Sequence, residues 1–271
     1  MLTTEVNWLN IAVVPAKDEE GRISKVLETL SKTAVDRILV VLNGSSDGTL
    51  EEISKKNIPN VDLLVFDEPL GYDIPRAVGA LYALKIDADC VIFTDGDMTG
   101  DLKPVIDKLI ESILLKKADL AMTLCIPNGI RQNKIAKELY SFRKLFNRRL
   151  GIYEKVSVAI PSHGPCAVSK DLIKLADIRD FAVPPVISAF AVKNSLLIEA
   201  PVTIRSSELG SKERGFFHAR KIADTIIGDI IEAMNYFEGK PRSRTFDSKE
   251  YQGFNPLRRF DLLENFMKTF I

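Results

Sequence analysis

Short apolar runs alternate with amphipathic stretches along the first half of the chain. The runs cover residues 11–14, 37–42, 61–66, 90–94 and 120–124. Between the first two, apolar side chains recur at helical spacing, at Ile23, Val26, Leu27 and Leu30. Apolar runs of this length are typical of strands buried on both faces. Strands that alternate with helices predict an α/β fold with a mostly parallel central sheet and helices on both faces.

Two of the expected helices begin at residues that favour a helix start. Thr49 and Glu52 have the spacing of a capping box. Asp73 precedes a helix that has Pro75 in its first turn, and its side chain is expected to cap that helix. A further helix is expected over residues 101–117.

The composition excludes several classes of protein. The 271 residues include 37 Lys plus Arg and 37 Asp plus Glu, so a strongly basic nucleic-acid-binding surface is not expected. Cys90, Cys125 and Cys166 stand mostly in apolar runs and are expected to be reduced core residues. No window approaches about 18 uninterrupted apolar residues, and the start of the chain lacks the pattern of a secretory leader. A cytoplasmic protein without a transmembrane segment is therefore expected.

The strongest chemical feature is Asp95-Gly96-Asp97, directly after the apolar run 90–94. Ligands of open parallel sheets bind at the carboxyl ends of the strands, where these residues are expected. Two carboxylates at this spacing project to the same side, and Gly96 lets a ligand approach the backbone. Oxygen ligands of this kind suit Mg²⁺ or Mn²⁺. An acidic turn that only caps the next helix is the alternative.

Four blocks together make the chain resemble the GT-A-fold glycosyltransferases of the dolichyl-phosphate-mannose synthase and glucosyl-3-phosphoglycerate synthase kind. The blocks are Val-Pro-Ala-Lys-Asp-Glu-Glu at 14–20, Val-Val-Leu-Asn-Gly-Ser-Ser-Asp-Gly-Thr at 40–49, Gly71 with Ala-Val-Gly-Ala at 77–80, and Phe-Thr-Asp-Gly-Asp at 93–97. Their order and spacing match the family over residues 11–125. Residues 163–169 and 198–202 resemble the family's acceptor-side segment and closing strand.

The resemblance implies a nucleoside diphosphate sugar as donor and assigns residues to it. Pro15, Ala16 and Glu19 would line the nucleoside, and Asn43 would contact the base. Gly71, Arg76 and Gly96 would complete the donor site, with Arg76 placed to meet phosphate charge. A solvent-exposed arginine is the alternative for Arg76.

The metal ligands and the second histidine also follow from the resemblance. Asp95 would face the ribose or the metal, and Asp97 would hold the metal that bridges the diphosphate. His218 would join them as a third ligand. A surface histidine at a helix start is the alternative for His218.

Two departures from the family bear on base recognition and on mechanism. Relatives usually carry an acid where this chain has Leu42 or Asn43, so the nucleobase is left open. Inverting relatives place a catalytic carboxylate before the helix that leads to the closing strand, where the nearest acid here is Asp180. With Asp180 as general base an inverting transfer is expected; without it, a retaining transfer assisted by the diphosphate.

The acceptor is expected to bind between residues 127 and 164. Arg131 is the first choice to meet a phosphate or carboxylate. His163, next to Gly164, is expected to contact the acceptor or the diphosphate, and a hydrogen-bonded loop histidine is the alternative for it. Basic residues follow along a helix, and a solvated basic face is the alternative for them.

The division of the chain follows from these assignments. Residues 1–240 are expected to form one GT-A domain, with a donor and metal part (1–125) and an acceptor part (126–240). Residues 241–271 form an extension that mixes arginines with aromatic residues. This extension is expected to pack on its own chain or to pair two copies in a homodimer, and peripheral contact with an anionic bilayer is a further alternative.

The expected reaction is the metal-dependent transfer of a hexosyl group to a hydroxyl acceptor, with a small phosphorylated or carboxylated molecule as one candidate. Two other functions compete with it. A nucleotidyltransferase has a similar architecture, but it normally has a glycine-rich basic loop after the first strand, where this chain has residues 15–20. A catalytically silent sugar-nucleotide-binding protein would keep the donor motifs and lack the acceptor base.

Overall fold

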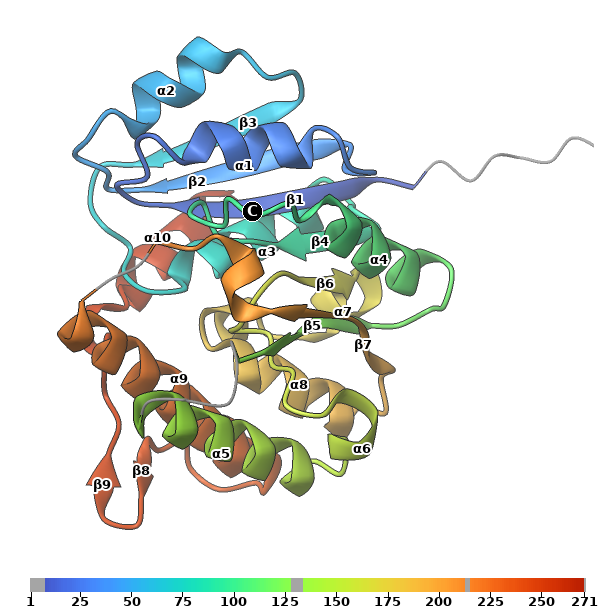
Figure 1. Cartoon of the computed structure of the whole chain (residues 1–271), viewed down its shortest axis with the longest axis vertical. Helices are drawn as coiled ribbons and strands as arrows, with labels where there is room; N and C mark the ends of the chain where they lie inside the picture. Colours follow the sequence, from blue (N-terminus) through green and yellow to red (C-terminus); the bar gives the residue numbers. More distant parts are fainter. Residues whose placement is uncertain (1–7, 128–133, 213–214, 271) are drawn as a thin grey trace, which may run out of the picture.

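A twisted sheet runs through the middle of the molecule (Figure 1). The computed structural model describes residues 8–127, 134–212 and 215–270. Within them the main sheet has seven strands in the order β3-β2-β1-β4-β6-β5-β7, and β6 runs antiparallel to both of its neighbours. Its strands are β1 (Asn10–Ala16), β2 (Arg37–Asn43), β3 (Val61–Phe66), β4 (Cys90–Phe93), β5 (Leu120–Ile126), β6 (Cys166–Ser169) and β7 (Ile198–Arg205). The predicted α/β fold with a mostly parallel sheet is confirmed.

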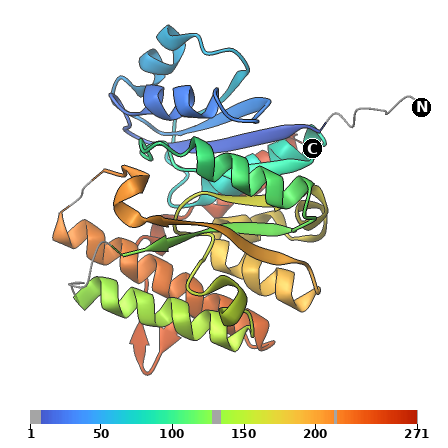
Figure 2. The same ribbon diagram turned by 45° about the vertical axis from the view of Figure 1, so that its right-hand side comes forward.

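Helices cover both faces of this sheet (Figure 2). They are α1 (Ile23–Leu30), α2 (Thr49–Lys56), α3 (Ile74–Lys85), α4 (Lys103–Leu114), α5 (Lys134–Arg149), α6 (Tyr153–Val156), α7 (Lys170–Leu175), α8 (Pro184–Lys193), α9 (Phe216–Phe237) and α10 (Phe260–Phe270), with short 3-10 turns η1 (Ile178–Ala182), η2 (Ser206–Leu209) and η3 (Asn255–Leu257).

Strand β1 shows why the apolar runs are continuous. Ile11 and Val13 enter the core that α3, α7 and α10 cover, whereas Ala12 and Val14 enter the core under α1 and α4. Successive side chains of a strand point to opposite faces, so a strand covered on both sides needs apolar residues throughout. A third core lies between α5, α8 and α9, away from the sheet.

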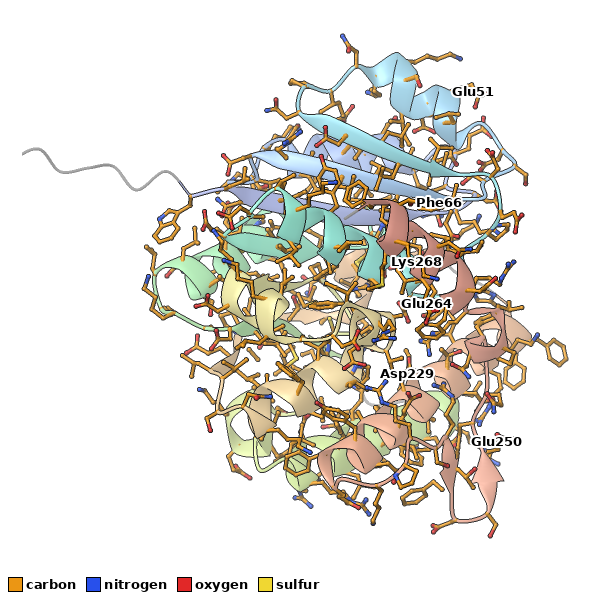
Figure 3. The ribbon with its side chains drawn as sticks, turned by 180° about the vertical axis from the view of Figure 1, so that it is seen from behind. Glu51, Phe66, Asp229, Glu250, Glu264 and Lys268 are labelled. Carbon is orange, nitrogen blue, oxygen red and sulfur yellow. The ribbon has the colours of Figure 1, made fainter. Side chains whose placement is uncertain are left out.

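The C-terminal segment, residues 241–270, packs against the rest of the same chain. It contains the hairpin of β8 (Thr245–Phe246) and β9 (Lys249–Glu250), then η3 and α10. Helix α10 lies along α3 and the edge of the sheet (Figure 3), where Phe266 contacts Phe66 at 5.5 Å between ring centroids. This is one of the arrangements expected for the extension.

Both predicted helix caps are wrong. The residue before α2 is Gly48, and the Glu52 carboxylate accepts hydrogen bonds from Gly21 N at 2.6 Å and Ser24 N at 3.1 Å. Glu52 therefore serves the start of α1 instead of its own helix. Asp73 has a left-handed backbone, with φ of 60°, and its side chain makes no capping bond. The partners of Glu52 lie 31 and 28 residues away in the sequence, and Arg258, which binds one oxygen of Asp73, lies 185 residues away.

None of the helices in the described part of the chain has both the length and the apolar character needed to cross a membrane.

Candidate active site

The two predicted metal-binding carboxylates lie just beyond the carboxyl end of β4, in the middle of the sheet. β4 itself is fully buried, and the Asp95 side chain is 41% exposed. Asp97 Oδ2 accepts a hydrogen bond from Lys212 N at 3.3 Å. The buried strand thus delivers two carboxylates to the edge of the sheet where ligands of parallel sheets bind.

Gly96, between the two carboxylates, packs closely against the end of β1. Its N–H donates to Pro15 O at 3.0 Å, and an added Cβ would lie 3.0 Å from that oxygen and 3.2 Å from the Ala16 Cβ. The predicted donor residues Pro15 and Ala16 therefore lie directly against the Asp95–Asp97 turn. Close approach to β1 is enough to explain the glycine.

The loops after β1 and β2 hold each other through side-chain bonds. Ser46 N donates to Asp18 Oδ1 at 2.8 Å, and Glu19 N donates to Thr49 Oγ1 at 2.8 Å. The predicted nucleoside contact Glu19 is only 5% exposed. These bonds join the first two sequence blocks into one wall beside the carboxylates.

Asn43 connects the end of β2 to the next loop. Its Oδ1 accepts from Leu70 N at 2.6 Å, and its Nδ2 donates to Gly71 O at 3.1 Å. An amide oxygen has two lone pairs, so a base contact would use the second. Gly71, with φ of +88°, is crossed by the C-terminal segment, because an added Cβ would lie 1.8 Å from Leu257 O.

Arg76 is buried behind Asp95, so the solvent-exposed alternative is wrong. Its Nη2 lies 2.7 Å from Asp95 Oδ1, and its Nε lies 3.3 Å from Asp73 Oδ1. Burial lowers the pKa of Arg76, but the charges of Asp95 and Asp73 outweigh it and raise that pKa above its ordinary value. Burial raises the pKa of Asp73 to about 6, although Arg258 and Arg76 act to lower it. The guanidinium adds positive charge at the base of the site.

The segment after β7 closes the other side, and the sequence analysis missed it. Gly100 N donates to Leu209 O at 2.9 Å, and Thr99 Oγ1 donates to Gly210 O at 2.9 Å. An added Cβ on Gly100 would lie 1.9 Å from Glu208 O. The glycines at 100 and 210 were the available signal for this close approach.

The carboxylates of Asp95 and Asp97 fit a divalent ion that takes its other ligands from a substrate and from water. Mg²⁺ and Mn²⁺ accept one or two carboxylates and complete their shells with phosphate oxygens and water. Within the described residues, no three His, Cys, Asp or Glu side chains are grouped so as to hold a metal by themselves. The expected trio of Asp95, Asp97 and His218 is therefore not preassembled. The His218 ring packs on Phe254 at 5.1 Å, on the first turn of α9.

His163 and Gly164 lie at the carboxyl end of β5, against α5. Arg143 Nη1 lies 2.8 Å from His163 Nδ1, and Cys125 Sγ donates to His163 O. Burial, and then the charge of Arg143, lowers the pKa of His163 to about 3. Because a guanidinium only donates, Nδ1 must accept, and the ring proton is on Nε2. His163 is thus a neutral donor. Arg131, the expected acceptor contact, lies outside the described residues.

Arg143 differs from the other arginines of α5 in being buried. Its side chain is buried, and Nε donates to Val158 O at 2.6 Å. By contrast, Arg148 lies over the Tyr153 ring and Arg149 pairs with Glu238. Arg143 therefore anchors α5, and these other arginines of the helix have partners on its outer side.

Asp180 is paired with the C-terminal segment. Its carboxylate accepts from Arg242 Nη2, and Asp177 and Arg179 are the other charges that act on it. Burial raises the pKa of Asp180 against the effect of Arg242. A general base needs a lone pair directed at the acceptor, and the arginine takes part of that capacity.

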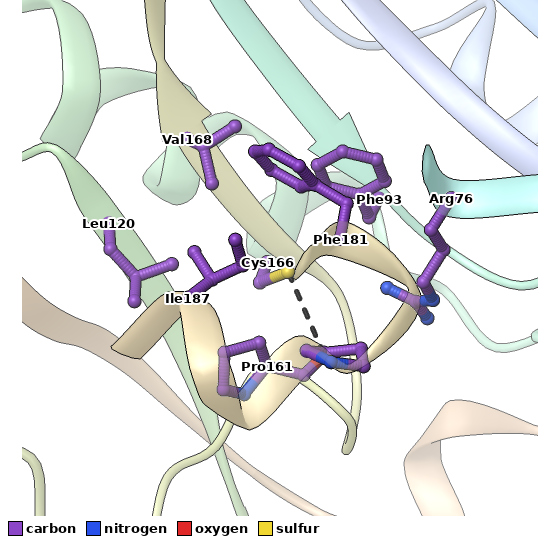
Figure 4. A pocket seen from close by; sticks show the side chains of 9 residues that line it. Arg76, Phe93, Leu120, Pro161, Cys166, Val168, Phe181 and Ile187 are labelled. Carbon is purple, nitrogen blue, oxygen red and sulfur yellow. Dashed lines mark hydrogen bonds between the residues drawn. The ribbon is translucent and has the colours of Figure 1, made fainter. Parts of the chain in front are cut away.

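A small apolar cavity lies beside Arg76 (Figure 4). Phe93, Cys166 and Phe181 line it, and it encloses about 10 Å³. A void of this size holds one water at most, so it is a gap in the packing and not a substrate site. The carboxyl edge of the sheet, where Asp95 lies, is the place where parallel sheets bind their ligands.

A mostly parallel sheet with paired carboxylates at the end of its central strand is the arrangement of a GT-A-fold glycosyltransferase. Residues 11–175 match the family model described as glycosyl transferase family 2. The chain belongs to this family.

Solved structures support the same fold. Glucosyl-3-phosphoglycerate synthase from Mycobacterium tuberculosis, in complex with Mn²⁺, UDP-glucose and phosphoglyceric acid, has a TM-score of 0.58 and 15% identity, over 87% of this chain and 81% of that one. The same enzyme in complex with UDP has a TM-score of 0.57 and 16% identity, over 87% and 82%. At these identities the similarity shows the fold alone.

One curated relative is closer in sequence. An uncharacterised protein of Methanocaldococcus jannaschii is 36% identical over 129 residues, which are 46% of this chain and 52% of that protein. The chain thus matches about half the length of this relative.

Proposed function

We propose that the protein transfers a hexosyl group from a nucleoside diphosphate sugar to a hydroxyl of a small acidic acceptor, with Mg²⁺ or Mn²⁺ as cofactor. The observation that carries this proposal is the pair Asp95 and Asp97 at the end of β4, inside the segment that matches the family. The M. tuberculosis enzyme of similar fold binds Mn²⁺ and UDP-glucose, which supports the choice of donor and ion.

The donor would lie along the edge formed by the loops after β1, β2 and β4. Pro15, Ala16 and Glu19 would line the nucleoside, and Asn43 would face the base. Asp95 and Asp97 would hold the metal, which supplies positive charge to the departing diphosphate. Arg76, buried behind Asp95, adds a fixed cation that needs no reorganisation during the reaction.

The acceptor would bind on the side of β5 and β6. His163 Nε2 would be a neutral donor for an acceptor oxygen. Gly164 beside it lets the loop pack against β5, because an added Cβ would lie 2.6 Å from Cys125 Sγ. We keep Arg131 as the partner of a phosphate or carboxylate. The phosphoglyceric acid bound by the enzyme of similar fold supports an acceptor of this class.

The pairing of Asp180 with Arg242 bears on the stereochemistry. It favours a retaining transfer, in which the diphosphate assists deprotonation, over an inverting transfer with Asp180 as base. The same pairing favours a second candidate, a binding protein that holds the sugar nucleotide without transfer.

Two measurements test the proposal. Calorimetry with UDP, GDP and ADP, with and without Mn²⁺, should show metal-dependent binding of one nucleotide. Asp97→Asn should then lower donor turnover by at least about a hundredfold at an unchanged melting temperature, because charge stabilisation of the leaving group is lost. Asp101→Asn, an exposed acid in the same loop, is the matched control and should keep full activity.

The outcomes separate the candidates. Full turnover of Asp97→Asn, or no nucleotide binding by the wild type, would reject the transferase. Binding without release of nucleoside diphosphate from any sugar donor would establish the silent binding protein.

The three free cysteines support a reducing compartment, so a cytoplasmic location is part of the proposal.

A further inference from the structure

A line of buried charges runs from the C-terminal segment to the candidate metal site. Its members alternate in sign and come from four parts of the chain. They are Asp229 on α9, Arg258 in the C-terminal segment, Asp73 and Arg76 at the start of α3, and Asp95 after β4. Their side chains are 0%, 1%, 12%, 5% and 41% exposed, in that order. The line therefore opens to solvent at the Asp95 end.

Arg258 uses its whole guanidinium in this line. Nη1 and Nη2 bind the two oxygens of Asp229 at 2.7 and 2.8 Å, and Nη2 also donates to Asp73 Oδ2 at 3.1 Å. Nε donates to Tyr72 O at 3.1 Å, and Nη1 to Asn255 Oδ1 at 3.1 Å. A planar fork can satisfy these five acceptors together, and a lysine ammonium cannot.

Asp73 passes this restraint to Arg76. One Asp73 oxygen accepts from Arg258, and the other lies 3.3 Å from Arg76 Nε. Arg76 then meets Asp95 with its far nitrogen at 2.7 Å. With Nε held by Asp73, the position of the outer nitrogens of Arg76 depends on where Asp73 is held.

The backbone contacts of the same segment act on the same turn. Arg259 N donates to Leu70 O at 2.9 Å, and Leu257 O lies where Gly71 has no side chain. The C-terminal segment thus holds residues 70–73 by both backbone and side chain.

We propose that Arg258, anchored by Asp229, is a positioning residue of the donor site: it holds Asp73, which places the Arg76 guanidinium against Asp95. This inference rests on the proposed function for its consequence, because Arg76 is there to meet the charge of a diphosphate. It makes the C-terminal segment, which lies outside the family match at 11–175, a working part of the site.

The chain offers a matched control for the test. Arg244 belongs to the same segment, has a side chain that is 6% exposed against 1% for Arg258, and also pairs with Asp229. Its other bonds go to Glu232, Tyr251 O and Thr225 O instead of to Asp73. Arg258→Lys and Arg244→Lys should therefore destabilise the fold alike, and only Arg258→Lys should disturb Arg76.

Two readouts decide the matter. In titrations of the full-length protein with UDP and Mn²⁺, Arg258→Lys should weaken binding about tenfold, as loss of an outer-shell partner does, and Arg244→Lys less than twofold. In crystal structures, Arg258→Lys should lose the Arg76–Asp95 contact, which Arg244→Lys should keep. Should Arg258→Lys fail to fold, Asp229→Asn removes the anchor with little change of shape and is judged by the same contact.

Equal UDP affinity in the two lysine variants, or a retained Arg76–Asp95 contact in Arg258→Lys, would overturn the inference. A wild-type protein that binds no nucleoside diphosphate would reject the proposed function instead. In that case the crystallographic contact still decides whether Arg258 positions Arg76.

Discussion

At the scale of single residues, the close approaches around the site depend on glycine. An added Cβ would lie 1.8 Å from a backbone oxygen at Gly71, 1.9 Å at Gly100 and 3.0 Å at Gly96. Van der Waals contact between carbon and other heavy atoms needs more room than this. These glycines let loops from distant parts of the chain meet at the edge of the sheet.

Replacing Gly71 by alanine separates this steric effect from backbone strain. Gly71 and Gly151 both have positive φ, at +88° and +72°, but only Gly71 would place a Cβ within 4 Å of another residue, 1.8 Å from Leu257 O. In urea unfolding, Gly151→Ala should lose about 1–2 kcal/mol, the usual penalty of the left-handed region. Gly71→Ala should lose about 1–3 kcal/mol more, because the C-terminal segment must move. Equal losses would show that the segment does not press on Gly71.

At the scale of elements, helices α1 and α2 are joined by the carboxylate of Glu52. This residue belongs to α2, but it accepts hydrogen bonds from the start of α1. The first N–H groups of a helix lack partners within it, and Glu52 of α2 supplies acceptors to the turn that begins α1. Lys56 of α2 and Glu28 of α1 form a second link. Pairing of two helices on one face of the sheet thus replaces a local cap.

Substitution of Glu52 should reveal this link through its pH dependence. Burial acts to raise the pKa of Glu52, but hydrogen bonds from Ser24 and Gly21 outweigh it and hold that pKa below its ordinary value. A lowered folded-state pKa stabilises the protein above the unfolded-state value of about 4.3, and this contribution is lost as the pH falls through the folded-state pKa. Glu52→Gln should therefore lose about 1 kcal/mol at pH 7, and the difference from wild type should shrink below about pH 4.

The neighbouring Glu51, which is exposed on the same helix (Figure 3), provides the control. Glu51→Gln should leave the unfolding free energy within about 0.5 kcal/mol of the wild-type value, both at pH 7 and below about pH 4. A loss at pH 7 that persists at low pH would contradict the link from Glu52 to α1.

At the scale of the whole molecule, the sheet separates two apolar cores, and the C-terminal segment ties α9 to the loop before α3. Arg244 and Arg258 bind Asp229 of α9, while Arg259 N donates to Leu70 O and Arg258 Nε donates to Tyr72 O, in the loop before α3. Residues at the end of the chain thus complete contacts among elements formed much earlier in it.

The cysteines test whether these cores open only as a unit. Cys90, Cys125 and Cys166 are buried, and burial raises the pKa of the thiols of Cys125 and Cys166 to about 11 and that of Cys90 as well. Thiolate is the reactive form, so a thiol-specific reagent at pH 8 should label none of them in the native protein and all three in denaturant. Fast labelling of one cysteine in the native state would show local opening of its core.

Much of this architecture could be predicted from short stretches of sequence. The strands end within about two residues of the predicted limits, because burial on both faces demands unbroken apolar runs. The position of Asp95 and Asp97 at a strand end followed from the same runs. The hydrogen-bond partners of Thr49, Glu52 and Asp73 could not be predicted in this way. Their local patterns favoured helix caps, but distant residues bind their side chains in the structure.

The sequence by itself determined the alternation of strands and helices, the family and the candidate metal-binding carboxylates, since each depends on residues close together along the chain. Only the tertiary structure decided what surrounds them. Arg258 binds Asp229 and Asp73 across separations of 29 and 185 residues, and Arg242 reaches Asp180 across 62. A buried charge must find an opposite charge wherever the fold places one, and no local pattern specifies which distant residue that is.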